Sequence, residues 1–203
     1  MKTYHSDIFD FTTVKTPAGQ GSLLVSEPFL RERYFMHAVV SLIDVPQRTG
    51  SMGVVLNNRT ALMLDEVMDN IDAARKINVY CGGPVSQDRL FFVHTLGDII
   101  IPQAQQYAPG LWVGGDFDAI ADYINSGYPI DGCVRFFVGY SGWDPGQLQA
   151  ELDNNVWAVA ANPAVTPAEL LTLHGDALWH RVVRSMGPSY RRWQLHPMSL
   201  HAN

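Results

Sequence analysis

The sequence feature that most constrains the fold is the run at residues 134–140, which is apolar on both of its alternating faces. A strand that is hydrophobic on both sides is buried on both sides, so this run predicts a central strand of a β-sheet. Other β-rich runs lie before and after it, at residues 22–26, 38–43, 52–57, 78–80, 89–94 and 156–160. Turn-forming residues between 38–43 and 52–57 predict that these two runs form a hairpin.

Helices are indicated by their capping residues. Asp116 precedes the helical pattern at 117–124 and Gly127 follows it, as an N-cap and a C-terminal glycine do. An Asp-Pro-Gly-Gln segment from Asp144 predicts a helix through residue 152, and a Thr-Pro-Ala-Glu segment from Thr166 predicts another. Patterns at 62–71 and 177–186 complete the set. Strands and short helices mix without a regular βαβ order, which favours an α+β fold.

The length of 203 residues fits a single domain, which we expect to span residues 1–203. Within it, residues 1–20 predict an extended N-terminal arm and residues 188–203 a basic C-terminal tail. The formal net charge is −6, yet no acidic residue follows Asp176, whereas several arginines do. An acidic body repels a polyanion, so direct nucleic-acid binding is disfavoured.

Composition also bears on location. The longest apolar runs are far short of the roughly 18 residues that a membrane-spanning helix needs, so we expect no membrane association. The first residues lack the apolar segment of a signal peptide. Cys81 and Cys133 have neither metal-type nor redox-type spacing, which fits a reducing compartment. A cytoplasmic location is therefore predicted.

The common catalytic motifs are not found. The sequence has no phosphate-binding glycine loop and no paired histidine or cysteine motif with metal spacing. The segment from Gly139 to Gly142 resembles the turn that carries a nucleophilic serine, but Trp143 stands where the second glycine belongs. We therefore interpret it as a strand-to-helix turn in which Ser141 bonds to the backbone. No catalytic residue, cofactor or metal is predicted.

Two glycine-rich corners remain as candidate binding surfaces, at Gly82-Gly83 and at residues 139–147. Glycine lets the backbone approach a ligand closely, and the N-terminus of the helix expected after Asp144 could receive an anion. Tyr140 and Trp143 could supply a flat apolar wall. The candidate ligand or partner surface comprises Asn57, Gly82, Gly83, Arg89, His94, Arg135, Ser141, Trp143 and Gln147.

Two classes of function are compatible with this surface. The first is a non-enzymatic protein that acts by binding a partner or ligand, which the lack of catalytic motifs favours. The second is a small-molecule enzyme or ligand sensor, in which Arg89 or Arg135 binds an anion and His94 acts as acid and base. The enzyme hypothesis requires His94 and one arginine to point into the same cavity.

Several longer motifs resemble the AlgH/YqgE family. They are GSLLVSEP at 21–28, GSMGVVLN at 50–57, GGPV at 82–85, DRLF at 88–91 and GYSGWDPGQLQAEL at 139–152. The chain departs from the family pattern at Asn58, where a basic residue is usual, and at Ser141, where alanine is common. The resemblance implies an α+β domain with a branched mixed β-sheet, partly closed into a small barrel and surrounded by helices. Members of the family are often labelled transcriptional regulators, so the resemblance also implies a role in regulation. It implies no catalytic residue and no cofactor for this chain.

Overall fold

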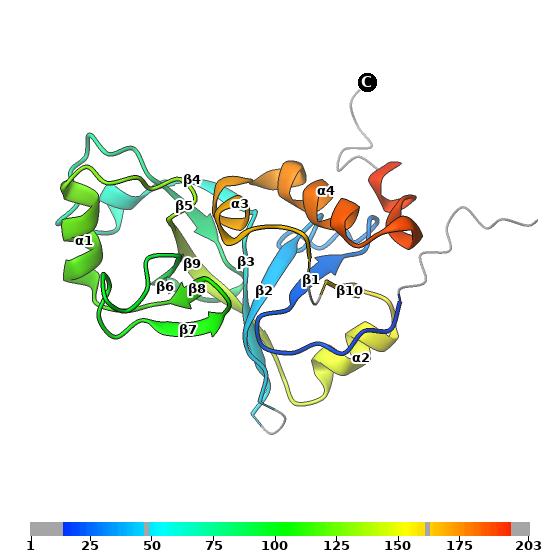
Figure 1. Ribbon diagram of the computed structural model, residues 1–203. Coiled ribbons are helices and arrows are strands. Elements are labelled where there is room, and N and C mark those ends of the chain that lie inside the picture. The colour runs from blue at the N-terminus through cyan, green and yellow to red at the C-terminus, as the bar shows by residue number, and fades with distance from the viewer. Residues whose placement is uncertain (1–13, 47–48, 161–162, 196–203) are drawn as a thin grey trace, which may run out of the picture.

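The fold is built on one branched sheet, seen in a computed structural model that describes residues 14–46, 49–160 and 163–195 (Figure 1). The strands are β1 (Leu23–Ser26), β2 (Val39–Asp44), β3 (Ser51–Val55), β4 (Arg59–Met63), β5 (Asn78–Cys81), β6 (Val85–His94), β7 (Gln105–Ala108), β8 (Leu111–Val113), β9 (Val134–Trp143) and β10 (Trp157–Ala160). The α-helices are α1 (Phe117–Asn125), α2 (Gln147–Asp153), α3 (Pro167–Thr172) and α4 (Gly175–Ser185). Short 3₁₀ turns lie at Leu64–Glu66, Pro188–Tyr190 and Trp193–Leu195.

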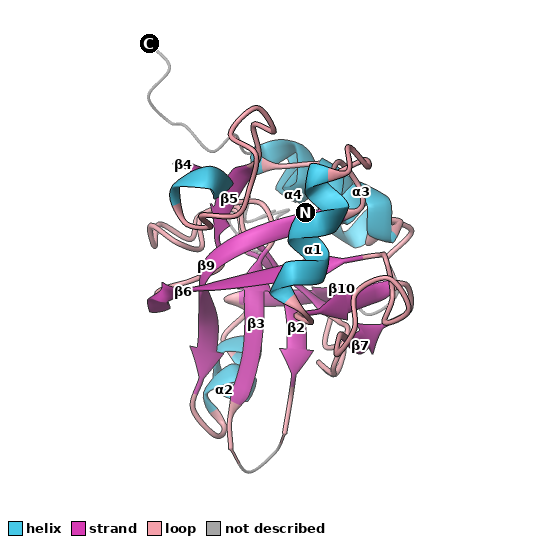
Figure 2. Cartoon of the chain, turned by 90° about the vertical axis from the view of Figure 1, so that its left-hand side faces the viewer, coloured by secondary structure: helices cyan, strands magenta, loops and turns pink. Residues whose placement is uncertain are grey.

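Strand β9 is the central strand, as its two apolar faces predict. One edge of β9 pairs with β6, while the other edge is shared: residues 136–138 pair in parallel with β5, and residues 141–143 pair antiparallel with β3. The main path of the sheet runs β10-β1-β2-β3-β9-β6-β8-β7. Strand β5 branches from β9 and pairs in turn with β4 (Figure 2). The branched, mixed sheet is therefore confirmed, and so is the hairpin of β2 and β3.

Gly82 and Gly83 stand at the branch point. The Gly82 carbonyl accepts hydrogen bonds from the backbone N–H of Val55 on β3 and from the Ser141 hydroxyl on β9. A Cβ atom on Gly83, whose φ is +149°, would lie 2.4 Å from the carbonyl carbon of Tyr140. Glycine is thus required here because β5 ends against the backbone of β9 where β9 changes its partner.

The sheet curls so that its distant strands approach each other. The hydroxyls of Ser41 on β2 and Tyr107 on β7 are 3.0 Å apart and buried, which joins two strands far apart in the strand order. Helix α4 packs over β1 and β2, α1 covers the opposite end of the sheet, and α2 lies beside β10 (Figure 1). Trp179 of α4 and Phe136 of β9, which belong to separate hydrophobic clusters, are both fully buried. The structure is therefore the α+β half-barrel that the resemblance implies.

Three local predictions were wrong or incomplete. Residues 62–71 do not form a helix, because residues 59–63 pair with β5 as strand β4 and only one 3₁₀ turn follows. Strands β7 and β8 were not predicted, since their short runs carry little periodic signal. Asp144 does not cap α2: the N-cap is Gly146 at φ +81°. By contrast, Asp116 and Thr166 cap α1 and α3 as predicted.

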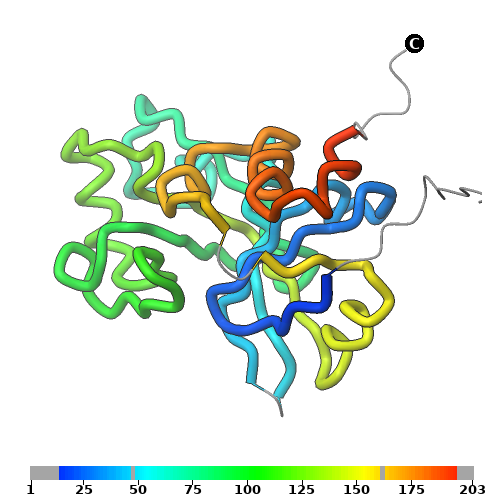
Figure 3. The backbone as a smooth tube through the Cα atoms, turned by 45° about the vertical axis from the view of Figure 1, so that its right-hand side comes forward, coloured from blue at the N-terminus to red at the C-terminus, as the bar shows by residue number. Residues whose placement is uncertain are grey.

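The described parts of the predicted arm and tail lie against the body of the protein. The Lys15 ammonium donates to the carbonyl oxygens of Leu152 and Asp153 at the end of α2, at 2.7 and 3.1 Å. The backbone before β1 accordingly runs beside α2 (Figure 3). In the tail, Tyr190 and Trp193 are buried, and Trp193 stacks on a tryptophan of α4. Within residues 14–46, 49–160 and 163–195, no helix has both the length and the apolar character needed to cross a membrane.

Candidate functional site

The predicted corner at residues 139–147 is a self-contained structural unit. The indole N–H groups of Trp143 and Trp157 both donate to Oε2 of Glu151, at 2.8 and 2.7 Å, and the Gln147 amide donates to Oε1 at 2.9 Å. Trp143 is buried, so it forms no open wall. Ser141 lies within strand β9 rather than on a strand-to-helix turn, because pairing with β3 extends β9 to Trp143. The interpretation of Ser141 as a backbone-bonded serine agrees with its contact to Gly82.

His94 and Arg135 point to opposite faces of the sheet. On β6 and β9, Val93 lies opposite Arg135 and His94 lies opposite Val134, and successive side chains of a strand alternate between faces. Neither His94 nor Arg89 lines the cavity that Arg135 reaches, and Arg89 is exposed on β6 whereas His94 is fully buried. The hypothesis of an enzyme that combines His94 with an arginine in one cavity is therefore wrong.

His94 is instead a fully buried part of the core. Its Nε2–H donates to the carbonyl of Gly114 at 3.1 Å, and its Nδ1 accepts from the backbone N–H of Leu96 at 3.3 Å. Burial lowers the pKa of His94 below its ordinary value. A neutral ring satisfies both contacts, whereas a protonated ring would lose the second one.

The Asn57 side chain is also occupied by hydrogen bonds to the backbone. Its Oδ1 accepts from the backbone N–H of Val39 at 2.9 Å, and its Nδ2 donates to the carbonyls of His37 and Gly175 at 2.8 and 2.9 Å. The side chain thus links β2, β3 and the start of α4. Of the nine residues predicted for a ligand surface, Arg135 lines a cavity of about 710 Å³, and the other eight do not line it.

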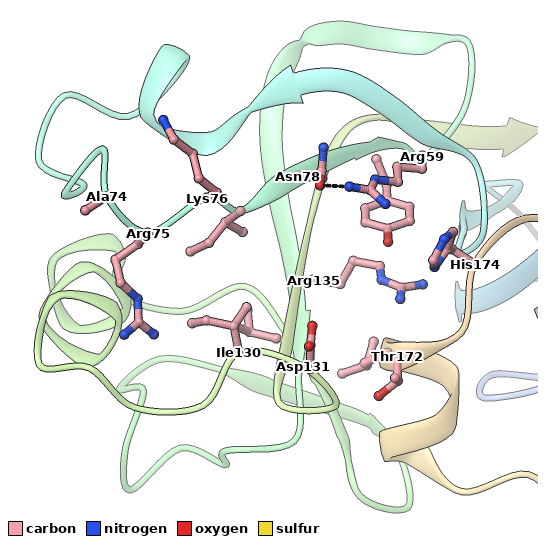
Figure 4. Close-up of a pocket in the computed structure, with 14 residues that line it drawn as sticks. Arg59, Ala74, Arg75, Lys76, Asn78, Ile130, Asp131, Arg135, Thr172 and His174 are labelled. Carbon is pink, nitrogen blue, oxygen red and sulfur yellow. Dashed lines mark hydrogen bonds between the residues drawn. The ribbon is translucent and has the colours of Figure 1, made fainter.

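We call this hollow the Arg135 cavity. It has a volume of about 710 Å³ and lies where β5 and β9 begin, next to the segment between α3 and α4 (Figure 4). It is lined by Arg59, Ala74, Arg75, Lys76, Ile77, Asn78, Tyr80, Ile130, Asp131, Val134, Arg135, Leu171, Thr172 and His174. This volume is within the range of about 300–1,000 Å³ that is typical of small-molecule sites.

Arg135 is the most unusual group in the cavity because it is a charged residue that is only 3% exposed. Its guanidinium carbon lies 4.1 Å from the centre of the Tyr80 ring, a cation–π contact. Nη1 donates to the carbonyls of Leu56, Leu173 and Leu170, at 2.7, 3.0 and 3.2 Å. Burial lowers the pKa of Arg135 to about 10, so the group remains charged at neutral pH.

Two nitrogens of this guanidinium are left over. Among the described residues, Nε and Nη2 of Arg135 have no hydrogen-bond acceptor, and no carboxylate lies within 4.0 Å of the guanidinium. Asp131 acts on Arg135 only through its charge, at longer range, and raises the pKa of the arginine. The bonded side of the guanidinium is buried, whereas Nε and Nη2 are open to the cavity, where an anionic oxygen can accept hydrogen bonds from them.

The rest of the lining is also basic. Arg59, Arg75 and Lys76 contribute further positive charge, whereas Asp131 is the only acidic residue of the lining. None of these four residues was predicted for the site. They come from separate segments that no sequence spacing connects, and the one available signal was the charged residue inside the apolar run at 134–140.

Comparisons with known proteins agree with the fold. A UPF0301 protein of Parabacteroides distasonis is 42% identical over 98% of both chains, and one of Bacteroides thetaiotaomicron is 37% identical over 95% of both. The solution structure of the AlgH protein of Pseudomonas aeruginosa has a TM-score of 0.68 at 26% identity, covering 87% of this chain and 94% of that one. A crystal structure of a Corynebacterium diphtheriae protein has a TM-score of 0.69 at 23% identity, covering 95% of this chain and 98% of that one.

The family assignment rests on the sequence as well as on the fold. The family model described as AlgH-like matches residues 23–191, which include every strand and helix from β1 to α4. The chain therefore belongs to the AlgH-like family.

Proposed function

We propose that this chain is a ligand-binding protein that takes an anion into the Arg135 cavity. The observation that carries the proposal is the buried guanidinium of Arg135, which has two nitrogens without acceptors among the described residues. Carbonyl dipoles and the Tyr80 ring compensate part of its charge but do not neutralise it. A phosphate or carboxylate oxygen would do so through charge-assisted hydrogen bonds.

Binding is favoured over catalysis because the predicted acid–base group, His94, lies on the opposite face of the sheet. A role in transcriptional regulation would then depend on a bound ligand or a protein partner, since the net charge of −6 opposes direct contact with DNA. A cytoplasmic location is part of the proposal, and it is supported by Cys81 and Cys133, which are both free thiols.

The proposal is tested by titrating inorganic phosphate into isotope-labelled protein and following backbone amide signals. We expect saturable shifts at residues that line the Arg135 cavity, with affinity that falls as salt concentration rises. Arg135→Lys keeps the charge but loses the planar fork, and should weaken phosphate binding about tenfold. Arg89→Gln removes an exposed arginine outside the cavity and is the matched control.

Phosphate binding that is equal in Arg89→Gln and Arg135→Lys would contradict the proposal, as would the lack of any saturable shift. Because Arg135→Lys could unfold the protein, Arg59→Gln provides a second test. Arg59 is exposed on β4 at the rim of the cavity, so its loss should weaken phosphate binding without disturbing the core.

A further inference from the structure

The Arg135 cavity carries positive charge at two separate places. Arg59 lies beside Arg135 at one end, whereas Arg75 and Lys76 project from the loop before β5 at the other end (Figure 4). Ile77, Ile130 and Val134 line the cavity as well and give it apolar wall. We propose that the cavity binds an organic dianion: two carboxylate or phosphate groups joined by a short aliphatic spacer. This inference rests on the proposed anion site at Arg135 and extends it.

The second cationic end is held in place by the fold. The Arg75 guanidinium donates through Nη2 to the carbonyl of Tyr128 at 2.6 Å, and the backbone N–H of Arg75 donates to the carbonyl of Asp72 at 2.8 Å. The segment is in turn fixed to α1, because the backbone N–H of Asp72 donates to the Asn125 side chain at 3.0 Å. In the described part of the chain no carboxylate forms an ion pair with Arg75, so its charge remains available.

Lys76 adds a charge that is only weakly engaged. Its ammonium lies 4.0 Å from a carboxylate oxygen of Asp65, and its side chain is 68% exposed. This distance is the upper limit of an ion pair, and the exposed ammonium has no hydrogen bond among the described residues that would hold it away from a ligand. Asp131, the acidic residue of the lining, acts on Arg135 and thus belongs to the other end.

Size and lining together favour an organic ligand with two charges over a single small anion. A cavity of about 710 Å³ is far larger than one phosphate group, which Arg135 and Arg59 could hold alone. Ile130 is partly exposed between the two cationic ends, so a hydrocarbon spacer can cover it (Figure 4). A ligand with one charge would leave either the Arg75 end or the Arg135 end without a counter-charge.

The test is calorimetric titration with straight-chain dicarboxylates of increasing length, with the matching monocarboxylates and with inorganic phosphate, all at one ionic strength. We expect one dicarboxylate length to bind at least tenfold more tightly than its monocarboxylate. In the double variant Arg75→Gln/Lys76→Gln this preference should disappear, whereas phosphate should still bind and its binding should still depend on Arg135. Arg89→Gln, outside the cavity, should keep both properties.

The outcomes separate the two proposals. If phosphate binds and depends on Arg135, but no dicarboxylate exceeds its monocarboxylate, then the two-ended site is wrong and the anion site stands. If the preference for dicarboxylates persists in Arg75→Gln/Lys76→Gln, then the second charge is recognised elsewhere and the inference fails. If neither phosphate nor any carboxylate binds, both proposals fail.

Discussion

Replacing Glu151 with alanine should be among the most damaging changes at any half-buried position of this chain. Its carboxylate accepts the indole N–H groups of Trp143 and Trp157, and these tryptophans are 5% and 1% exposed. A hydrogen bond to a charged group is worth about 1.5–3 kcal/mol, and a buried donor without an acceptor costs about as much. Glu151→Ala should therefore lower the free energy of unfolding by about 3–6 kcal/mol, a large part of the 5–15 kcal/mol typical of a folded domain.

The measurement is urea unfolding followed by tryptophan fluorescence, with thermal unfolding as a second readout. For a chain of this size a loss of about 4 kcal/mol corresponds to a fall of about 8–16 °C in the unfolding midpoint. The control is Gln149→Ala on the same helix, since Gln149 is exposed and bonds only to Asp153 one turn away. Its expected cost is within about 0.5 kcal/mol. Equal costs for the two variants would refute the role assigned to the carboxylate.

Three further predictions concern other buried groups. Burial lowers the pKa of His94 from 6.5, so below pH 6.5 the unfolded state binds a proton more readily than the folded state does. The free energy of unfolding should therefore be at its full value above pH 6.5 and should fall below it. Urea midpoints measured at several pH values should fall less steeply in His94→Gln than in the unmodified protein. Gly83→Ala places a Cβ 2.4 Å from backbone and should cost about 2–5 kcal/mol, whereas Gly19→Ala, with no atom within 4 Å, should be nearly neutral in the same unfolding assay. Asn57→Ala removes three hydrogen bonds and should lower the free energy of unfolding by about 3 kcal/mol. The amide hydrogen of Val39, which bonds to Asn57, should exchange faster, and an unchanged exchange rate would contradict this role of Asn57.

The strands and capped helices were predictable where a local signal agreed with the tertiary contacts. The run at 134–140 predicted a central strand because burial on both faces leaves no polar side. The N-caps Asp116 and Thr166 could be predicted because an N-cap needs only a side-chain oxygen that accepts a hydrogen bond from a backbone N–H two or three residues later in the chain. The helix expected at 62–71 failed because Arg59 and Met63 pair with Tyr80 and Asn78 on β5, a non-local contact that overrides a helical apolar pattern.

The candidate site was predicted less well than the fold, and the reason is physical. The most distinctive motif, at residues 139–152, was predicted as part of a ligand surface, yet its Trp143 and Gln147 side chains both donate to Glu151 of the same motif. A motif that satisfies its own polar groups in this way is distinctive because it builds a corner of the fold. Arg135 was named among the candidates, but its partners in the lining lie on β4, on β5 and between α3 and α4, and only the folded chain brings them together.

The branch in the sheet accounts for both the fold and the cavity. Because β5 pairs with β9 only at residues 136–138, the start of β9 is paired with β6 on one edge and has no strand on the other. Arg135 stands at this unpaired position, and its guanidinium reaches the last carbonyls of α3 instead of solvent. An apolar side chain there would leave the carbonyl oxygens of Leu56, Leu170 and Leu173 without this donor, so the arginine has a structural role through Nη1. That role explains Nη1 only. Nε and Nη2 form no bond among the described residues and are open to the cavity, where the cationic lining around them favours an anionic ligand.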